Sequence, residues 1–386
     1  MQAALANVPD GKHASSRVGS ALFGAGIGRK PFSGAEWDLG LGCQRPRRSH
    51  AAPATNRRGT RPPARKRHPA PRRAGPTRGH LPRLPRLLSS SSPALHTRAS
   101  TRYNSSSLST REKGTRMQQQ LTKQTPEGFL LVGRIDAPEQ PKAAVVIVHG
   151  LCEHFGRYDY VTQRLLEAGY AVVRFDHRGH GRSMGKKVWY DDRTQIVSDT
   201  DLFVEEARAQ FPDLPVFMIG HSMGGFGAAS YGTAHPGKLD GYVLSGAWTR
   251  DHASLASGAV EQGLDPETYI PNELGDGVCS DPAVGEAYLA DPFVIKEFSV
   301  ALLRAVHDGH LWLRAQAADF ADPVLLLHGG DDGLVSPQDS IDMFREASSA
   351  DKSLRIYAGL YHEIFNEFKK DRVIRDAIEW LDDHVR

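Results

Sequence analysis

The stretch "IGHSMGGFGA" (219–228) places Ser222 between two glycines, directly after the apolar run "PVFM" (215–218). Residues 220–224 match the pattern G-x-S-x-G, which marks a nucleophilic serine only when a strand precedes it and a helix follows it. The apolar run predicts that strand, and the small residues of "GGFGAAS" (224–230) predict that helix. We therefore interpret Ser222 as a nucleophile on a sharp strand-to-helix turn, rather than as an incidental serine in a glycine-rich loop.

From residue 127 onward, short runs rich in Val, Ile and Leu alternate with longer amphipathic stretches. This alternation is typical of an α/β protein, with helices packed around a mostly parallel sheet. Strands are expected at 128–134, 143–149, 171–176, 215–220, 239–245, 323–329 and 353–359. Helices are expected at 160–169, 199–211, 223–235, 338–347 and 373–385.

The alternation is interrupted between Trp248 and Ala321, where "SVALLRAVHDGHLWLR" (299–314) and its neighbours have helical spacing and no strand is expected. Ligands of open α/β sheets bind at the carboxyl ends of the strands. Helices inserted after a strand end would therefore lie over such a site. We expect a helical cap at about 249–320, inserted before the strand at 323–329.

The first 116 residues differ in composition from the rest. They contain 23 Lys and Arg against 4 Asp and Glu, whereas residues 117–386 contain 25 against 41, so a basic arm of charge +19 precedes an acidic body of charge −16. Half of the 24 prolines also lie in the arm. Such a segment cannot bury a core, and we expect 1–116 to be disordered and 117–386 to form the α/β domain.

Three explanations of the arm stay open: a transit peptide, a basic tail for nucleic acid or an anionic surface, or upstream sequence absent from the functional protein. We favour the third, because Met117 offers a natural start just ahead of the first periodic segment. No nucleic-acid partner is expected, since the arm lacks the interleaved aromatic residues on which bases stack.

No stretch reaches the roughly 18 consecutive apolar residues needed to span a bilayer. The three cysteines, Cys43, Cys152 and Cys279, are too few for a disulfide framework and favour a reducing compartment. No Cys/His spacing suggests a zinc site, so neither a metal nor a cofactor is expected. We expect a cytoplasmic protein, soluble or peripherally attached to a membrane, or an organelle-targeted one if the arm is a transit segment.

A serine nucleophile needs a base and an acid, and in this kind of site the chain order is Ser, then Asp or Glu, then His. After "PVLLLHGGDDGLV" (323–335) only His362 and His384 remain. His362 follows a strand in a loop, whereas His384 ends a solvated helix, so His362 is the expected base. The acid is Asp331 or Asp332. We favour Asp332, because the apolar residues after it can anchor the loop and fix the carboxylate.

The tetrahedral intermediate of such a reaction needs backbone N–H donors. One belongs to the residue after the nucleophile, here Met223. The other comes from the loop after an early strand, and "VIVHGLCEH" (146–154) offers the N–H of Leu151.

With these residues in place, the chain resembles the monoacylglycerol lipase and lysophospholipase branch of the serine α/β-hydrolases. The matching segments follow in order from about 127 to 385: "HGLCEHFGRYDYV" (149–161), "FDHRGHGRSMG" (175–185), "PVFMIGHSMGG" (215–225), "CSDPAVGEAYLADPF" (279–293), "LLLHGGDDGLV" (325–335) and "IYAGLYHEIFNE" (356–367). The resemblance implies the α/β-hydrolase fold, a catalytic triad of Ser222, Asp332 and His362, and oxyanion donors at Leu151 and Met223.

The resemblance also implies that Glu153 and Arg157 face the glycerol end of a substrate, although the two could equally form an ion pair that only stabilises their loop. The turn "DHRGHGRS", with His177 and His180, is structural in this family rather than a metal site. One departure is Phe365, because animal monoacylglycerol lipases have a histidine at that position of the alcohol pocket. This departure concerns the alcohol preference and not the ester hydrolysis.

We expect a serine hydrolase that cleaves monoacylglycerols to fatty acid and glycerol through an acyl-enzyme. A lysophospholipase or a broad-specificity carboxylesterase is the alternative, and the acidic body favours a neutral lipid over a charged one. The expected partner is a small lipid ester, and the cap could make peripheral membrane contact. A non-catalytic protein on the same fold is the competing class, but such proteins usually lack a triad member.

Overall fold

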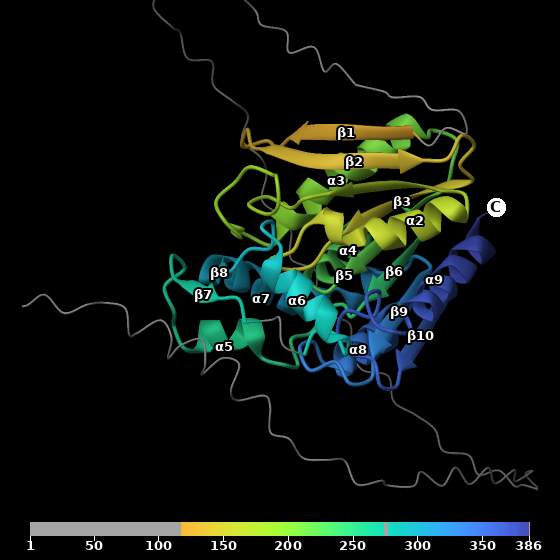
Figure 1. Cartoon of the computed structure of the whole chain (residues 1–386). Coiled ribbons are helices and arrows are strands. Elements are labelled where there is room, and N and C mark those ends of the chain that lie inside the picture. The colour runs from red at the N-terminus through yellow and green to blue at the C-terminus, as the bar shows by residue number, and fades with distance from the viewer. Residues whose placement is uncertain (1–116, 274–276, 386) are drawn as a thin grey trace, which may run out of the picture. The chain divides into compact units, whose positions relative to one another are not determined.

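The computed structural model describes residues 117–273 and 277–385, so the arm at 1–116 and the expectation of its disorder lie outside the described residues. The described part contains an eight-stranded sheet of order β1-β2-β4-β3-β5-β6-β9-β10 (Figure 1). Its strands are β1 (Met117–Gln124), β2 (Leu130–Ala137), β3 (Ala143–Val148), β4 (Tyr170–Phe175), β5 (Val216–His221), β6 (Gly241–Ser245), β9 (Val324–Gly329) and β10 (Lys352–Tyr357).

The pairs from β4 to β10 across the sheet are parallel, whereas β1 pairs antiparallel with β2 and β2 pairs antiparallel with β4. The predicted α/β class and mostly parallel sheet are therefore confirmed. The sequence does not predict β1, because Leu121 is the only buried residue among its eight. An edge strand with polar residues on both faces carries no apolar pattern.

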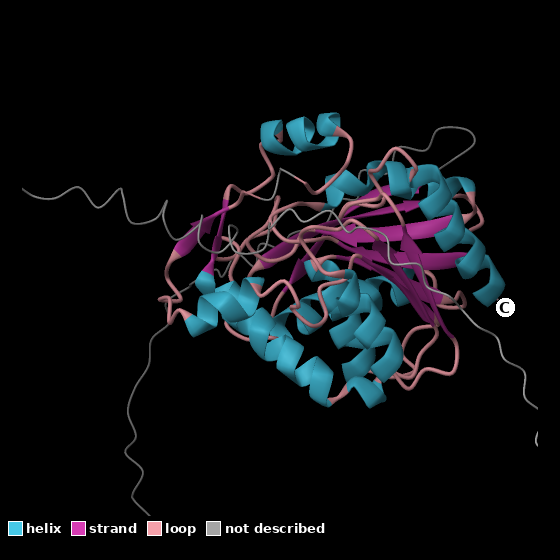
Figure 2. Ribbon diagram, turned by 90° about the horizontal axis from the view of Figure 1, so that it is seen from below, coloured by secondary structure: helices cyan, strands magenta, loops and turns pink. Residues whose placement is uncertain are grey.

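Helices cover both faces of this sheet (Figure 2). They are the short η1 (Phe155–Tyr158), α2 (Asp159–Glu167), α3 (Thr194–Gln210), α4 (Met223–Ala234), α8 (Pro337–Glu346) and α9 (Lys370–His384). Val145 and Ile147 of β3 belong to the core beneath α2 and α9. Val146 and Val148 belong to the opposite core, with α3, α4 and α8. Burial on both faces explains why the central strands are apolar throughout.

Between β6 and β9 the chain leaves the sheet. It forms α5 (Leu255–Glu261), β7 (Tyr269–Pro271), α6 (Pro282–Ala290), β8 (Glu297–Ser299), α7 (Val300–Ala315) and the short η2 (Ala317–Asp319). The expectation of no strand in this segment is wrong, because β7 and β8 pair antiparallel with Ile270 opposite Phe298. Runs of three residues are too short for hydrophobic periodicity to detect. Among the helices of the described residues, none is long and apolar enough to cross a membrane.

The start of α4 is pressed against the end of β3. A Cβ atom on Gly224 would lie 2.1 Å from the carbonyl oxygen of Val148 and 2.4 Å from that of His149. A Cβ atom on Gly220 would lie 2.4 Å from the carbonyl oxygen of Gly224. Both glycines of the pentapeptide are thus required by close backbone approach.

We expect Gly224→Ala to lower the free energy of unfolding by roughly 1–3 kcal/mol or more, since the added methyl group overpacks a site walled by backbone atoms. Urea unfolding followed by tryptophan fluorescence measures the change. Gly333→Ala is the matched control, because no atom lies within 4 Å of a Cβ there and its φ is ordinary. Equal stability of the two variants would contradict the packing argument.

Candidate active site

Ser222 lies between β5 and α4 in a strained backbone conformation. Its φ of 55° and ψ of −120° lie outside the regions that a side chain normally permits. Such strain costs of order 1–3 kcal/mol and persists only when the surroundings impose it. Here the N–H of Ser222 donates to the carbonyl of Ser245 (3.0 Å), and its own carbonyl accepts from the N–H groups of Phe226 (3.0 Å) and Trp248 (3.1 Å).

The carboxyl ends of β9 and β10 lead to Asp332 and His362. These two buried side chains are in direct contact, since Nδ1 of His362 lies 2.7 Å from Oδ2 of Asp332. The alternatives are elsewhere: the side chain of Asp331 is exposed, and the imidazole of His384 bonds to Trp380 and Asp351. The structure therefore brings together the pair that the sequence favours.

Ser222 and His362 line one cavity. The hydroxyl of Ser222 makes no hydrogen bond to any residue that the structure describes, so its Oγ is not linked to the imidazole in this conformation. The cavity measures only about 20 Å³ and is bounded on the side of α6 by Val278 and Tyr288. This volume is well below the roughly 300–1,000 Å³ that is typical of ligand sites.

The carboxylate of Asp332 is held from two sides. Oδ1 accepts hydrogen bonds from the N–H groups of Leu334 and Val335, both at 2.9 Å. The backbone, rather than the apolar side chains considered from the sequence, fixes this oxygen. Oδ2 faces His362 and also His328, whose Nε2 lies 3.1 Å away.

His328 is a neighbour of the acid that the sequence reasoning missed. It is the last residue but one of β9, is fully buried, and its Nδ1 lies 2.7 Å from Oγ of Ser340. Since Nε2 faces two acceptors, Oδ2 of Asp332 and the carbonyl of Val335 at 3.0 Å, we assign the ring proton to Nε2. His328 then donates to the same carboxylate oxygen as His362. In the sequence, the one indication of a role for His328 was its position near the end of a strand, in "LLLHGG" (325–330).

These contacts shift the pKa values of both Asp332 and His362. Burial raises the pKa of the Asp332 carboxyl, but the charge of His362 and the hydrogen bonds from His328 and His362 outweigh burial and hold that pKa well below 3.8. Burial lowers the pKa of His362, but the charge and hydrogen bond of Asp332, with the charges of Glu363 and Glu153, outweigh it and raise that pKa above 6.5. The imidazole is thereby made a better proton acceptor.

Two backbone N–H groups beside Ser222 have no hydrogen-bond partner among the described residues, those of Leu151 and Met223. Both residues are buried. A Cβ atom on Gly150 would lie 3.2 Å from Cβ of Ser222, so the loop that carries Leu151 runs directly past the serine. Buried N–H groups are rarely left unpaired, and these two are free to receive an oxyanion.

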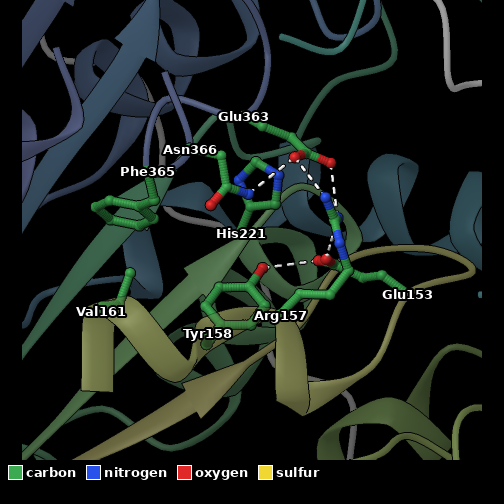
Figure 3. A pocket seen from close by; sticks show the side chains of 8 residues that line it. All are labelled: Glu153, Arg157, Tyr158, Val161, His221, Glu363, Phe365 and Asn366. Carbon is green, nitrogen blue, oxygen red and sulfur yellow. Dashed lines mark hydrogen bonds and ion pairs between the residues drawn. The ribbon is translucent and has the colours of Figure 1, made fainter. Parts of the chain in front are cut away.

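Glu153 and Arg157 form an ion pair that includes a third residue, Glu363 (Figure 3). Nη1 of Arg157 lies 2.7 Å from Oε2 of Glu153 and 2.7 Å from Oε1 of Glu363, and Nη2 lies 2.7 Å from Oε2 of Glu363. The other oxygen of Glu153 accepts from the N–H of Gly150 (2.6 Å) and the hydroxyl of Tyr158 (2.7 Å). The ion pair considered from the sequence is thus present, and all three charges line the cavity of Ser222.

Glu363 was not identified from the sequence, although it follows the expected base directly. Its N–H donates to the carbonyl of Val278 at 2.7 Å. The loop that bears His362 is therefore tied to the segment that closes the cavity. Phe365 is buried and lies beside this charge network, in a second small cavity (Figure 3).

The histidines of the turn after β4 are buried and bond to neighbouring backbone. The N–H of His177 donates to Nε2 of His149 at 3.0 Å, and Nδ1 of His180 faces the carbonyl of Arg178 at 2.9 Å. Burial lowers the pKa of His180 to about 4. Within residues 117–273 and 277–385, no group of three or more His, Cys, Asp and Glu side chains is placed to hold a metal ion.

Comparison with known proteins shows related chains. Residues 139–369 match the family described as serine aminopeptidase, S33. A monoacylglycerol lipase of Mycolicibacterium smegmatis is 37% identical over 265 residues, covering 67% of this chain and 95% of that protein. Phospholipase YtpA of Bacillus subtilis is 29% identical over 258 residues, covering 64% and 98%. The crystal structure of Paleococcus ferrophilus monoacylglycerol lipase matches with a TM-score of 0.59 and 30% identity, covering 66% and 99%.

We expect Asp332→Asn to lower the pKa of His362, because the charge of Asp332 is the largest of the effects that raise this pKa against burial. NMR titration of carbon-labelled histidine, with His362→Gln to assign the signal, measures this pKa. Asp331→Asn removes the same charge from the adjacent exposed position and should leave it nearly unchanged. A larger shift in the Asp331 variant would reverse the assignment of the acid.

Proposed function

Because this chain belongs to the family described as serine aminopeptidase, S33, and is a carboxylic ester hydrolase of the α/β-hydrolase fold, we propose that it cleaves monoacylglycerols to a fatty acid and glycerol. This proposal rests on one observation: the strained Ser222 shares a cavity with His362, which is hydrogen-bonded to Asp332. The relatives named monoacylglycerol lipase support the choice of substrate.

In the proposed mechanism, His362 accepts the proton of Ser222 as the serine oxygen attacks the acyl carbonyl. Asp332 orients the imidazole through the bond to Nδ1 and stabilises the imidazolium. This leaves Nε2 of His362 for the proton transfer. Glycerol departs with that proton, and water then repeats the sequence on the acyl-enzyme.

The N–H groups of Leu151 and Met223 stabilise the oxyanion of the tetrahedral intermediate. Both are buried and free of partners among the described residues, so they need no rearrangement when negative charge develops. One such donor is typically worth about 2.7–4 kcal/mol in the transition state.

Lysophospholipid hydrolysis is the second candidate, and the relative named phospholipase favours it. A panel of monooleoylglycerol, oleoyl-lysophosphatidylcholine, p-nitrophenyl butyrate and an aminoacyl p-nitroanilide separates lipase, lysophospholipase, general esterase and aminopeptidase. We expect the highest kcat/KM for monooleoylglycerol. A higher value for the lysolipid would move the enzyme to the second candidate.

Ser222→Ala should lower hydrolysis of monooleoylglycerol and of p-nitrophenyl butyrate by at least about 10³-fold, because the acyl-enzyme cannot form. Activity assays and labelling by a fluorophosphonate probe measure the loss, and circular dichroism checks that the fold is kept. Retained probe labelling or activity in the folded variant would refute the proposed nucleophile.

We also propose that the enzyme attaches peripherally to lipid surfaces through α6. Tyr288 of α6 closes the cavity of Ser222, and the next residue, Leu289, is 54% exposed. Phe293, just beyond α6, is 37% exposed. Exposed apolar side chains on the segment that contributes Tyr288 to the cavity can enter the interface in which a lipid substrate resides.

Leu289→Glu should reduce hydrolysis of monooleoylglycerol in vesicles by about tenfold, since burying a leucine side chain contributes about 1.5–3 kcal/mol. Hydrolysis of the water-soluble p-nitrophenyl butyrate should change little. Ile356→Glu on β10 is the control, because Ile356 is 44% exposed on another part of the sheet. Equal losses on both substrates would show that Leu289 acts on the chemistry and not on attachment.

A further inference from the structure

Glu363 contributes a second carboxylate to the cavity of Ser222. The side chains of Glu153, Arg157 and Glu363 all line this cavity, together with Ser222 and His362. They are nearly buried, with exposed side-chain fractions of 5%, 11% and 7%. Because little water screens these buried charges, they interact strongly with the alcohol part of an ester that is bound in the cavity.

Arg157 is the cation of this cluster and would ordinarily suit a phosphate. Its guanidinium is instead engaged by two carboxylates, through the fork-like contact with Glu363 and the single contact with Glu153 (Figure 3). Asn366 adds a fourth contact, since its Nδ2 lies 2.9 Å from Oε2 of Glu363. A phosphate oxygen that accepts from a remaining N–H group of Arg157 would therefore lie beside the carboxylates of Glu153 and Glu363.

The charges of the cluster do not cancel. Two carboxylates face one guanidinium, which leaves one negative charge before the carboxylate of Asp332 is counted. Burial raises the pKa of Glu153, but the charges of Arg157 and His221, together with the hydrogen bonds from Tyr158 and Gly150, outweigh burial and keep that pKa below 4.5, so this carboxyl stays ionised at neutral pH.

An uncharged polyol fits this environment, whereas a phosphate does not. Hydroxyl groups can donate to carboxylate oxygens and can also accept from the remaining N–H groups of Arg157. Phosphate oxygens only accept, and they carry the same charge as the two carboxylates. Like charges brought together without water are strongly unfavourable.

We propose that Glu363 is a specificity-determining residue that selects esters of uncharged alcohols and rejects lysolipids whose leaving group carries a phosphate. This inference rests on the proposed ester hydrolysis at Ser222. It attributes the rejection of phosphate-bearing lysolipids to the carboxylate of Glu363, which is bound to the guanidinium of Arg157.

The test compares monooleoylglycerol with oleoyl-lysophosphatidic acid, which has the same acyl chain and glycerol and differs by one phosphate. The full chain is assayed with both in nonionic micelles as wild type, Glu363→Gln, Glu363→Asp and Asp331→Asn. Because both substrates require the same chemistry, the ratio of their kcat/KM values isolates the alcohol group from any change in His362.

We expect the wild type to prefer monooleoylglycerol, and Glu363→Gln to raise the relative kcat/KM for the phosphate-bearing lipid by about tenfold or more. Glu363→Asp keeps the charge and should stay within about threefold of the wild-type ratio. Asp331→Asn removes an exposed charge beside the site and should leave the ratio unchanged.

Three results would overturn the inference: equal use of both lipids by the wild type, which needs no variant to fold; an unchanged ratio in folded Glu363→Gln; or the same change in Glu363→Asp as in Glu363→Gln. A wild type that reacts with the fluorophosphonate probe but cleaves neither lipid would instead refute the proposed substrate. Thermal unfolding of each variant confirms its folded state.

Discussion

The absence of a side chain at Gly224 determines where the parts of the site can meet. The first turn of α4 lies so close to the end of β3 that even one methyl group would overlap the carbonyl oxygen of Val148. This contact places Ser222 beside the loop that carries Leu151, and it leaves the N–H groups of Leu151 and Met223 unpaired in the described structure. The strain at Ser222 is sustained by the same packing.

Much of the sheet was predictable because its central strands are buried on both faces, and burial of that kind appears directly as runs of Val, Ile and Leu. Three strands were not predictable. The edge strand β1 is polar, and the short strands β7 and β8 have three residues each. Chain order narrowed the base to His362 or His384 and the acid to Asp331 or Asp332, and the structure pairs His362 with Asp332. The contacts of His328 and Glu363 did not follow from chain order, because they depend on loops that meet only in the folded chain.

The electrostatics of the site are organised around three carboxylates with different neighbours. Asp332 is held by two backbone N–H groups and two imidazoles, so it stays charged and fixes the position of the His362 ring. Glu153 and Glu363 share one guanidinium, and Glu153 also fixes the loop after β3 through the N–H of Gly150. Glu153, which suggested a glycerol subsite, is therefore also a structural support of the loop that carries Leu151.

The bond from the N–H of Glu363 to the carbonyl of Val278 joins the loop of the base to the segment over the cavity. Ser280 strengthens this junction, because its N–H and hydroxyl both donate to the carboxylate of Glu367. Residues 278 and 280 are therefore anchored at two points to the loop that follows β10, by hydrogen bonds and not by apolar packing alone.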